Sequence, residues 1–202
     1  MRKLVTIKDN EAYLRQISKE VVFPDANLLQ DFEDLKEYTI EHKVYAMASV
    51  QIGIPKRLIF VKTTDPNDRS KNGSNHITMV NPVIISKRGR TEFLEGCQSC
   101  LQYWAVVERP YEIVVDYLDL NGQAHTEKFE GFSATVLSHE IDHLDGILHM
   151  DRSNNFIDLD ENDKEARIAF RDAHPYKVIS KDCPFEYGPV KRFCLDYSTK
   201  NN

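Results

Sequence analysis

The chain has 202 residues, of which 41% are hydrophobic and 29% charged, a balance typical of a water-soluble domain with one core. A formal net charge of −6 argues against a protein that coats nucleic acid, so no DNA partner is expected. No run approaches the roughly 18 apolar residues that span a bilayer, and no apolar signal segment follows the N-terminal charges, so we expect a cytoplasmic protein with no membrane partner. Four cysteines are too few for a disulfide scaffold and are expected to be thiols or metal ligands.

The first half of the chain is predicted to contain two helices followed by strands. Helical spacing occurs near residues 10–19 and more clearly from Asp25, which is a candidate N-cap. Strand-like runs cover residues 57–62, 77–86 and 111–120. The polar, turn-rich segment 65–75 is predicted to be a mobile surface loop.

The second half begins with a hairpin and leads into an apolar helix. Asn121 and Gly122 predict a tight turn to a return strand over residues 124–130. Gly131 ends that strand, and Ser133 is a candidate cap for the next helix. Further elements are a helix over residues 161–173 and a tail from residue 174. The sequence therefore predicts an α+β fold of antiparallel sheets around one central helix, with a catalytic domain over residues 1–155 and a C-terminal helix and tail over residues 156–202.

The most informative motif is HEIDH, at residues 139–143 of that central helix. Residues four apart stack on one face of a helix, so His139 and His143 can bind one metal ion. Glu140 is placed to take a proton from water that the ion activates. Charged groups on an apolar helix need partners, which favours a metal site over two structural histidines.

A catalytic metal needs a third protein ligand, and three alternatives exist. His149 completes the metzincin pattern HExxHxxGxxH, although no methionine follows that can form the methionine turn of those enzymes. A downstream glutamate, Glu161 or Glu165, would match thermolysin-like enzymes. Cys97 offers a thiolate, which is a strong ligand for zinc or ferrous iron.

Three motifs in order resemble those of the peptide deformylases, metal hydrolases that remove the formyl group from N-formylmethionine on nascent chains. The family motifs are GxGxAAxQ, EGCxS and HExDH. The chain has VYAMASVQ at residues 44–51, EGCQS at 95–99 and HEIDH at 139–143, so the second and third are intact. The similarity covers roughly residues 1–155 and implies a peptide-deformylase-like fold.

The resemblance implies a role for each site residue. Cys97, His139 and His143 would hold one divalent ion, with Fe²⁺ expected and Zn²⁺ or Ni²⁺ as alternatives. Glu140 would be the general base, and the side-chain amide of Gln51 and the backbone N–H of Gln98 would stabilise the oxyanion.

The resemblance also implies partners and a setting. The substrate would be an N-formylmethionyl peptide, met during translation in the cytoplasm by a monomeric enzyme. A further hypothesis is that the protein contacts the ribosome through its C-terminal segment.

Neighbouring residues have less defined expected roles. Asp142 would either orient an imidazole or form a salt bridge on the helix surface. Glu95 would support either the metal site or the substrate strand. His149 is expected to face solvent or a neighbouring loop.

The first motif departs from the family pattern. Val44 and Ala46 replace glycines, and Ser49 replaces an alanine. Side chains at these positions are expected to crowd a peptide or forbid a turn. They motivate a rival hypothesis, in which a divergent deformylase-like protein binds metal but has reduced, lost or altered formyl-peptide activity.

Overall fold

The computed structural model describes residues 2–62, 76–154, 156–160 and 163–193. The expected loop over residues 65–75 and the candidate ligand Glu161 lie outside the described residues. The strands are β1 (Ala46–Ala48), β2 (Leu58–Lys62), β3 (His76–Glu95), β4 (Tyr103–Arg109), β5 (Glu112–Leu118), β6 (Ala124–Glu130), β7 (Ile157–Asp158) and β8 (Lys177–Pro184). The helices are α1 (Ile7–Leu14), α2 (Leu28–Glu41), α3 (Phe132–Leu144) and α4 (Lys164–Ala173), with 3₁₀ turns at Ser49–Ile52, Gln98–Cys100 and His149–Arg152.

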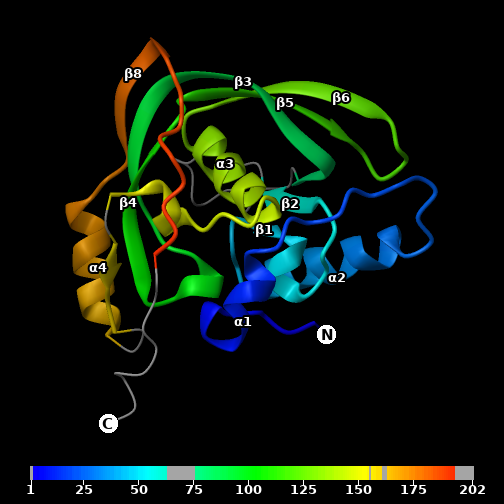
Figure 1. The fold of residues 1–202 in the computed structure, drawn as a ribbon, viewed down its shortest axis with the longest axis horizontal. Helices are drawn as coiled ribbons and strands as arrows, with labels where there is room; N and C mark the ends of the chain where they lie inside the picture. The colour runs from blue at the N-terminus through cyan, green and yellow to red at the C-terminus, as the bar shows by residue number, and fades with distance from the viewer. Residues whose placement is uncertain (1, 63–75, 155, 161–162, 194–202) are drawn as a thin grey trace.

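The strands pair antiparallel and surround α3. Strands β1, β2, β3, β4 and β7 follow one another in hydrogen-bonded order, while β5 pairs with β3 and β6. Figure 1 shows α3 at the centre, with β3, β5 and β6 arching over it and β1 and β2 on its other side. The predicted α+β architecture with a central HExxH helix is confirmed.

Strand β3 is the longest pairing partner in the sheet: its 20 residues form hydrogen-bonded pairs with four other strands. Its first half pairs with β2 and β5, with Leu58 opposite Val80. Its second half pairs with β4 and β8, with Glu95 opposite Ala105. Since β3 ends at Glu95, the following residues Gly96 and Cys97 leave the sheet beside α3.

Helix α3 packs through its buried face against an apolar core. Leu137 and Leu144 are almost fully buried and pack in one cluster with Ile59 and Val115. Each such side chain contributes about 1.5–3 kcal/mol when fully buried. This packing fixes the orientation of α3 relative to the sheet, and therefore the positions of its two histidines.

Two predicted helix starts are wrong. Asp25 does not cap α2: Asn27 precedes that helix, and the Asp25 carboxylate instead accepts from the Asn27 N–H and pairs with Lys56. Ser133 lies inside α3, because the helix already begins after Gly131, whose φ is +61°. In both cases the helix start differs by a few residues from the position that the polar side chain suggested.

The C-terminal segment is more ordered than a tail. Helix α4 lies within the predicted range, and β8 then pairs with the second half of β3. The segment from residue 174, expected as a tail, thus contains a strand over Lys177–Pro184. Among the described helices, none combines the length and apolar character needed to cross a bilayer.

Candidate metal centre and active site

Three side chains from two elements converge beside α3. His139 and His143 lie four residues apart on the helix, and Cys97 follows the end of β3. The Cys97 Sγ lies 3.2 Å from the His143 Nε2. One ligand atom from each of the three residues lies within 4.8 Å of the other two. Among the candidates that the structure describes, Cys97 is the one grouped with both histidines, whereas the His149 ring lies 5.7 Å from the His139 ring, centroid to centroid.

These residues fit a divalent metal by their chemistry as well as their spacing. The His139 Nδ1 lies 2.8 Å from the Glu95 carboxylate, which leaves its Nε2 for a ligand, as histidine ligands commonly do. The Cys100 thiol donates to Cys97 and, with His143 and His139, holds the pKa of Cys97 well below its usual value against the effect of burial. A thiolate with two imidazoles suits iron, zinc or nickel.

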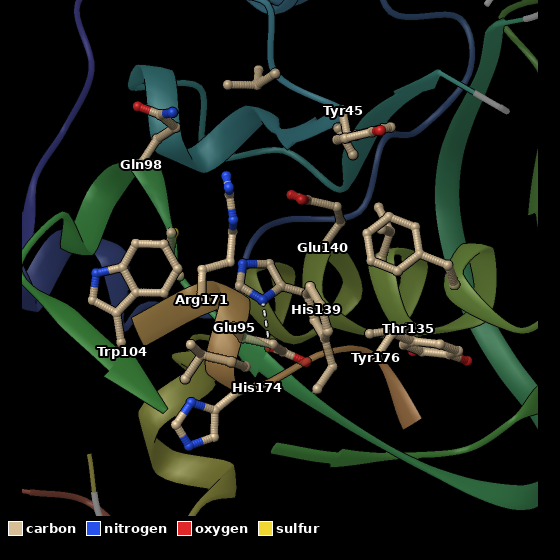
Figure 2. A pocket seen from close by; sticks show the side chains of 18 of the residues that line it. Tyr45, Glu95, Gln98, Trp104, Thr135, His139, Glu140, Arg171, His174 and Tyr176 are labelled. Atoms are coloured by element: carbon tan, nitrogen blue, oxygen red, sulfur yellow. Dashed lines mark hydrogen bonds and ion pairs between the residues drawn. The ribbon is translucent and has the colours of Figure 1, made fainter. Parts of the chain in front are cut away.

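Glu140 is buried next to this group. Its side chain lines the same cavity as His139, and Figure 2 shows both pointing into the cavity. Its Oε2 is buried and accepts no hydrogen bond from the part of the chain that the structure describes. Burial raises the pKa of Glu140, partly offset by the neighbouring histidines. A carboxylate with a free oxygen and a raised pKa is well suited to accept a proton.

Gln51 is also oriented towards the site. Its Oε1 accepts from the Ala48 N–H at 2.9 Å, which fixes the amide so that Nε2 faces Cys97 Sγ at 3.4 Å. Gln51 is 3% exposed. Gln98 begins the short turn after Cys97, and its exposed side chain lines the cavity. Both predicted residues therefore lie at the cavity.

His149 was expected to face solvent or a neighbouring loop, but it is buried against strand β4. It is 1% exposed, and its Nε2 lies 3.0 Å from the backbone carbonyl of Tyr103. Burial lowers its pKa to about 4, so its ring is neutral. Gly146, the glycine of the metzincin-like pattern, is explained by packing instead of by metal binding. A Cβ at this position would lie 2.2 Å from the Arg15 carbonyl oxygen, which is too close for any other residue. Glu165, another candidate ligand, is exposed on α4 and outside the cavity lining.

A buried arginine, which the sequence interpretation missed, supports the centre from behind. Arg109 is fully buried and binds both oxygens of Glu95, at 2.7 and 2.9 Å. It also donates to Asp142, whose other oxygen accepts from Arg152. Asp142 is thus neither at an imidazole nor on the surface, whereas Glu95 orients His139. The sequence does contain a feature that predicts this burial. In the alternating strand β4, Arg109 falls on the same side as the buried residues.

Arg109→Met is expected to lower the free energy of unfolding by about 3–5 kcal/mol, because it leaves two buried carboxylates without their shared cation. Urea unfolding of the metal-free protein measures this without a contribution from bound metal. Arg90→Met is the matched control: Arg90 pairs with Glu108 nearby on the sheet, but the two side chains are 48% and 39% exposed. That change should cost no more than about 1 kcal/mol. Equal losses for the two variants would show that the Arg109 network is not a stabilising element.

The catalytic candidates open into one large cavity of about 1250 Å³. Its walls come from the segment before and within β1, the end of β3, helix α3, and the C-terminal residues 167–178. Figure 2 shows Trp104 and Tyr176 at opposite sides of the centre. The volume exceeds the roughly 300–1,000 Å³ of ordinary small-molecule sites, so the cavity can hold a peptide.

The altered first motif is accommodated without strain. Among the described non-glycine residues, Lys43 and Asn81 have positive φ, so Val44 and Ala46 adopt ordinary backbone conformations. Val44 packs against the cluster formed by α2 and β2. The Ser49 hydroxyl donates to the Lys56 carbonyl at 2.7 Å. The left-handed conformation in this segment is taken by Lys43, the residue before Val44.

A thiol and two histidines beside a buried glutamate, on a helix enclosed by antiparallel strands, define a metal-dependent hydrolase of the HExxH class. The family model described as polypeptide deformylase matches residues 1–158. The chain belongs to this family.

Individual relatives agree. Peptide deformylase of Rhizobium meliloti is 37% identical over 139 residues, which cover 68% of this chain and 78% of that protein. That of Mesorhizobium japonicum is 34% identical over 167 residues, covering 82% of this chain and 92% of that protein. The crystal structure of a probable peptide deformylase from Synechococcus phage S-SSM7 matches with a TM-score of 0.66 and 35% identity, over 75% of this chain and 99% of that one. The Synechococcus elongatus enzyme in complex with actinonin matches with a TM-score of 0.66 and 30% identity, over 76% of this chain and 79% of that one.

Proposed function

We propose that this chain hydrolyses the formyl amide of N-formylmethionyl peptides, with Cys97, His139 and His143 holding one divalent ion. The observation that carries the proposal is the free Oε2 of buried Glu140 beside the Cys/His/His group in a cavity large enough for a peptide. Fe²⁺ is the proposed ion, with Zn²⁺ or Ni²⁺ as replacements, since sulfur and imidazole suit all three. When bound, such an ion supplies Lewis acidity, which lowers the pKa of water and polarises a carbonyl oxygen.

The surrounding residues move the proton and stabilise the developing charge. Glu140 accepts a proton from the attacking water and returns it to the nitrogen that leaves as the amine. The Gln51 Nε2 and the backbone N–H of Gln98 donate to the oxygen of the formyl group as it becomes negative. Loss of one such donor typically costs about 2.7–4 kcal/mol of activation free energy. Glu95 keeps the His139 ring in one orientation through its 2.8 Å contact with Nδ1.

The setting of the reaction is part of the proposal. The enzyme would act as a monomer on nascent chains in the cytoplasm, with residues 1–155 as its catalytic domain and residues 156–202 as an appended segment. The ribosome contact rests on the basic residues Lys164, Arg167 and Arg171 of α4. Two of these, Arg167 and Arg171, line the cavity, which leaves less basic surface for a ribosome.

The decisive test is hydrolysis of formyl-Met-Ala by the iron-loaded protein, with metal content measured on the same sample. We expect turnover together with about one metal ion per chain. Full metal occupancy without turnover would overturn the proposal. That result would favour the divergent, inactive reading that Val44 and Ala46 motivated.

A further inference from the structure

Two arginines of α4 form one wall of the catalytic cavity. Arg167 and Arg171 are four residues apart, so they project from the same side of the helix. Both line the cavity that contains His139 and Glu140. Figure 2 shows the Arg171 side chain extending over the cavity, with its guanidinium end on the side of Gln98. A chain with a net charge of −6 thus places two arginines together in the wall of its candidate active site.

The acidic groups of the cavity do not neutralise this wall. The other ionisable residues lining it are Lys43, Glu95, Cys97, His139, Glu140, Asp172, His174 and the tyrosines at 45, 111 and 176, and Cys97 is a proposed metal ligand. Glu95 is paired with Arg109, and Glu140 is the proposed base. Asp172 pairs with Arg171 at 3.0 Å. The Arg167 Nε is buried and has no hydrogen-bond partner within the ranges that the structure describes.

The pairing of Arg171 leaves it available to a ligand. Its side chain is 45% exposed and that of Asp172 is 64% exposed, and such solvated pairs contribute little. An incoming carboxylate can therefore replace Asp172 at low cost. An arginine fork binds carboxylates through two parallel hydrogen bonds, a geometry that lysine does not offer. The unpartnered Arg167 Nε adds a donor whose burial without a partner itself calls for a ligand or water.

The position of Arg167 and Arg171 in the cavity indicates which part of a bound substrate they would contact. The formyl group must lie at Glu140, and the lining rings of Tyr45 and Phe93, which both contact the ring of Phe132, suit the methionine side chain. The residues after methionine then occupy the remaining cavity, where α4 supplies the arginines. We propose that Arg167 and Arg171 recognise a carboxylate on the peptide beyond formylmethionine, so that the enzyme favours acidic substrates. This inference rests on the proposed deformylase function.

The test compares three substrates with the full-length, iron-loaded enzyme: formyl-Met-Ala-Asp-amide, formyl-Met-Ala-Asn-amide and formyl-Met-Ala-Asn with a free carboxylate. We expect kcat/KM for the aspartate peptide to exceed that for the asparagine amide by about fivefold at low salt. High salt should reduce this ratio. The third substrate separates the two sources of carboxylate, since a preference confined to it assigns the site to the peptide C-terminus. Isothermal titration with the products Met-Ala-Asp-amide and Met-Ala-Asn-amide gives the same comparison as a ratio of Kd values, independent of turnover.

Variants assign the effect to the wall. Arg167→Gln and Arg171→Gln should each lower the ratio, and together bring it near one. Lys164→Gln removes the same charge from an exposed position on α4 outside the cavity lining, and should keep the wild-type ratio. A wild-type ratio near one for both carboxylate sources would overturn the inference, as would an equal loss of preference in Lys164→Gln. Hydrolysis of the asparagine amide shows in either case that the deformylase function itself holds.

Discussion

Glu140→Gln is expected to lower kcat on formyl-Met-Ala by about 100- to 10,000-fold, the usual contribution of a positioned general acid–base. Glutamine keeps the shape of the side chain but cannot accept the proton. Because Glu140 is not one of the three clustered candidate ligands, metal content should stay at the wild-type level. Steady-state rates and metal analysis of the same preparation measure both quantities.

Glu165→Gln is the matched control for this variant. Glu165 is an exposed glutamate of α4, and the same chemical change there should leave both rate and metal content unaltered. It also tests Glu165 as the third ligand, one of the two glutamates that the thermolysin-like alternative offers. An unchanged kcat in Glu140→Gln would remove Glu140 from its proposed role.

The elements that the sequence predicted well are those whose pattern is local. Strands β2 and β5 and helix α3 each carry an apolar pattern over their own length, whereas β6 follows as the strand that returns from the tight turn after β5. The turn at Asn121 and Gly122 follows from the positive φ that glycine accepts there. For these elements, local preference and tertiary environment agree.

Strand β3 was only half predicted, because its second half is polar. The expected strand ended at residue 86, whereas β3 continues to Glu95 through several charged and exposed residues. Pairing with β4 and β8 stabilises this half, and β8 itself has an exposed, polar pattern. Neither the second half of β3 nor β8 has a sequence pattern that predicts a strand by itself. Each is stabilised as a strand by its pairing with the other, which lies far away along the chain.

The candidate site divides in the same way. Spacing on one helix predicts the His139–His143 pair, since helix geometry converts sequence distance directly into contact. The approach of this histidine pair to Cys97 depends on where β3 ends, and helical geometry does not predict that position. The expectation that Cys97 joins the pair came from the motif resemblance. The buried set of Arg109, Glu95 and Asp142 lies on two strands and a helix, so only the assembled fold brings these charges together.

Cys97→Ala is expected to abolish tight metal binding, whereas His149→Ala is expected to retain about one ion per chain. Cys97 supplies the single thiolate of the candidate centre, and its Sγ lies 3.2 Å from His143 Nε2. Its loss should weaken affinity by more than the roughly 10- to 100-fold that removal of an outer-shell partner costs. His149 instead contacts the Tyr103 carbonyl, at 3.0 Å. Metal stoichiometry and competition with a chelator measure these differences.

Cys183→Ala controls for the loss of a thiol as such, because Cys183 is a free, half-buried cysteine on β8 outside the candidate centre. It should bind metal like the wild type. The His149→Ala measurement is made below its unfolding temperature, since removal of a buried side chain lowers stability. If folded His149→Ala lost the ion while Cys97→Ala kept it, the third ligand would be His149. The centre would then be of the metzincin type, and the sulfur beside His143 would have no part in holding the metal.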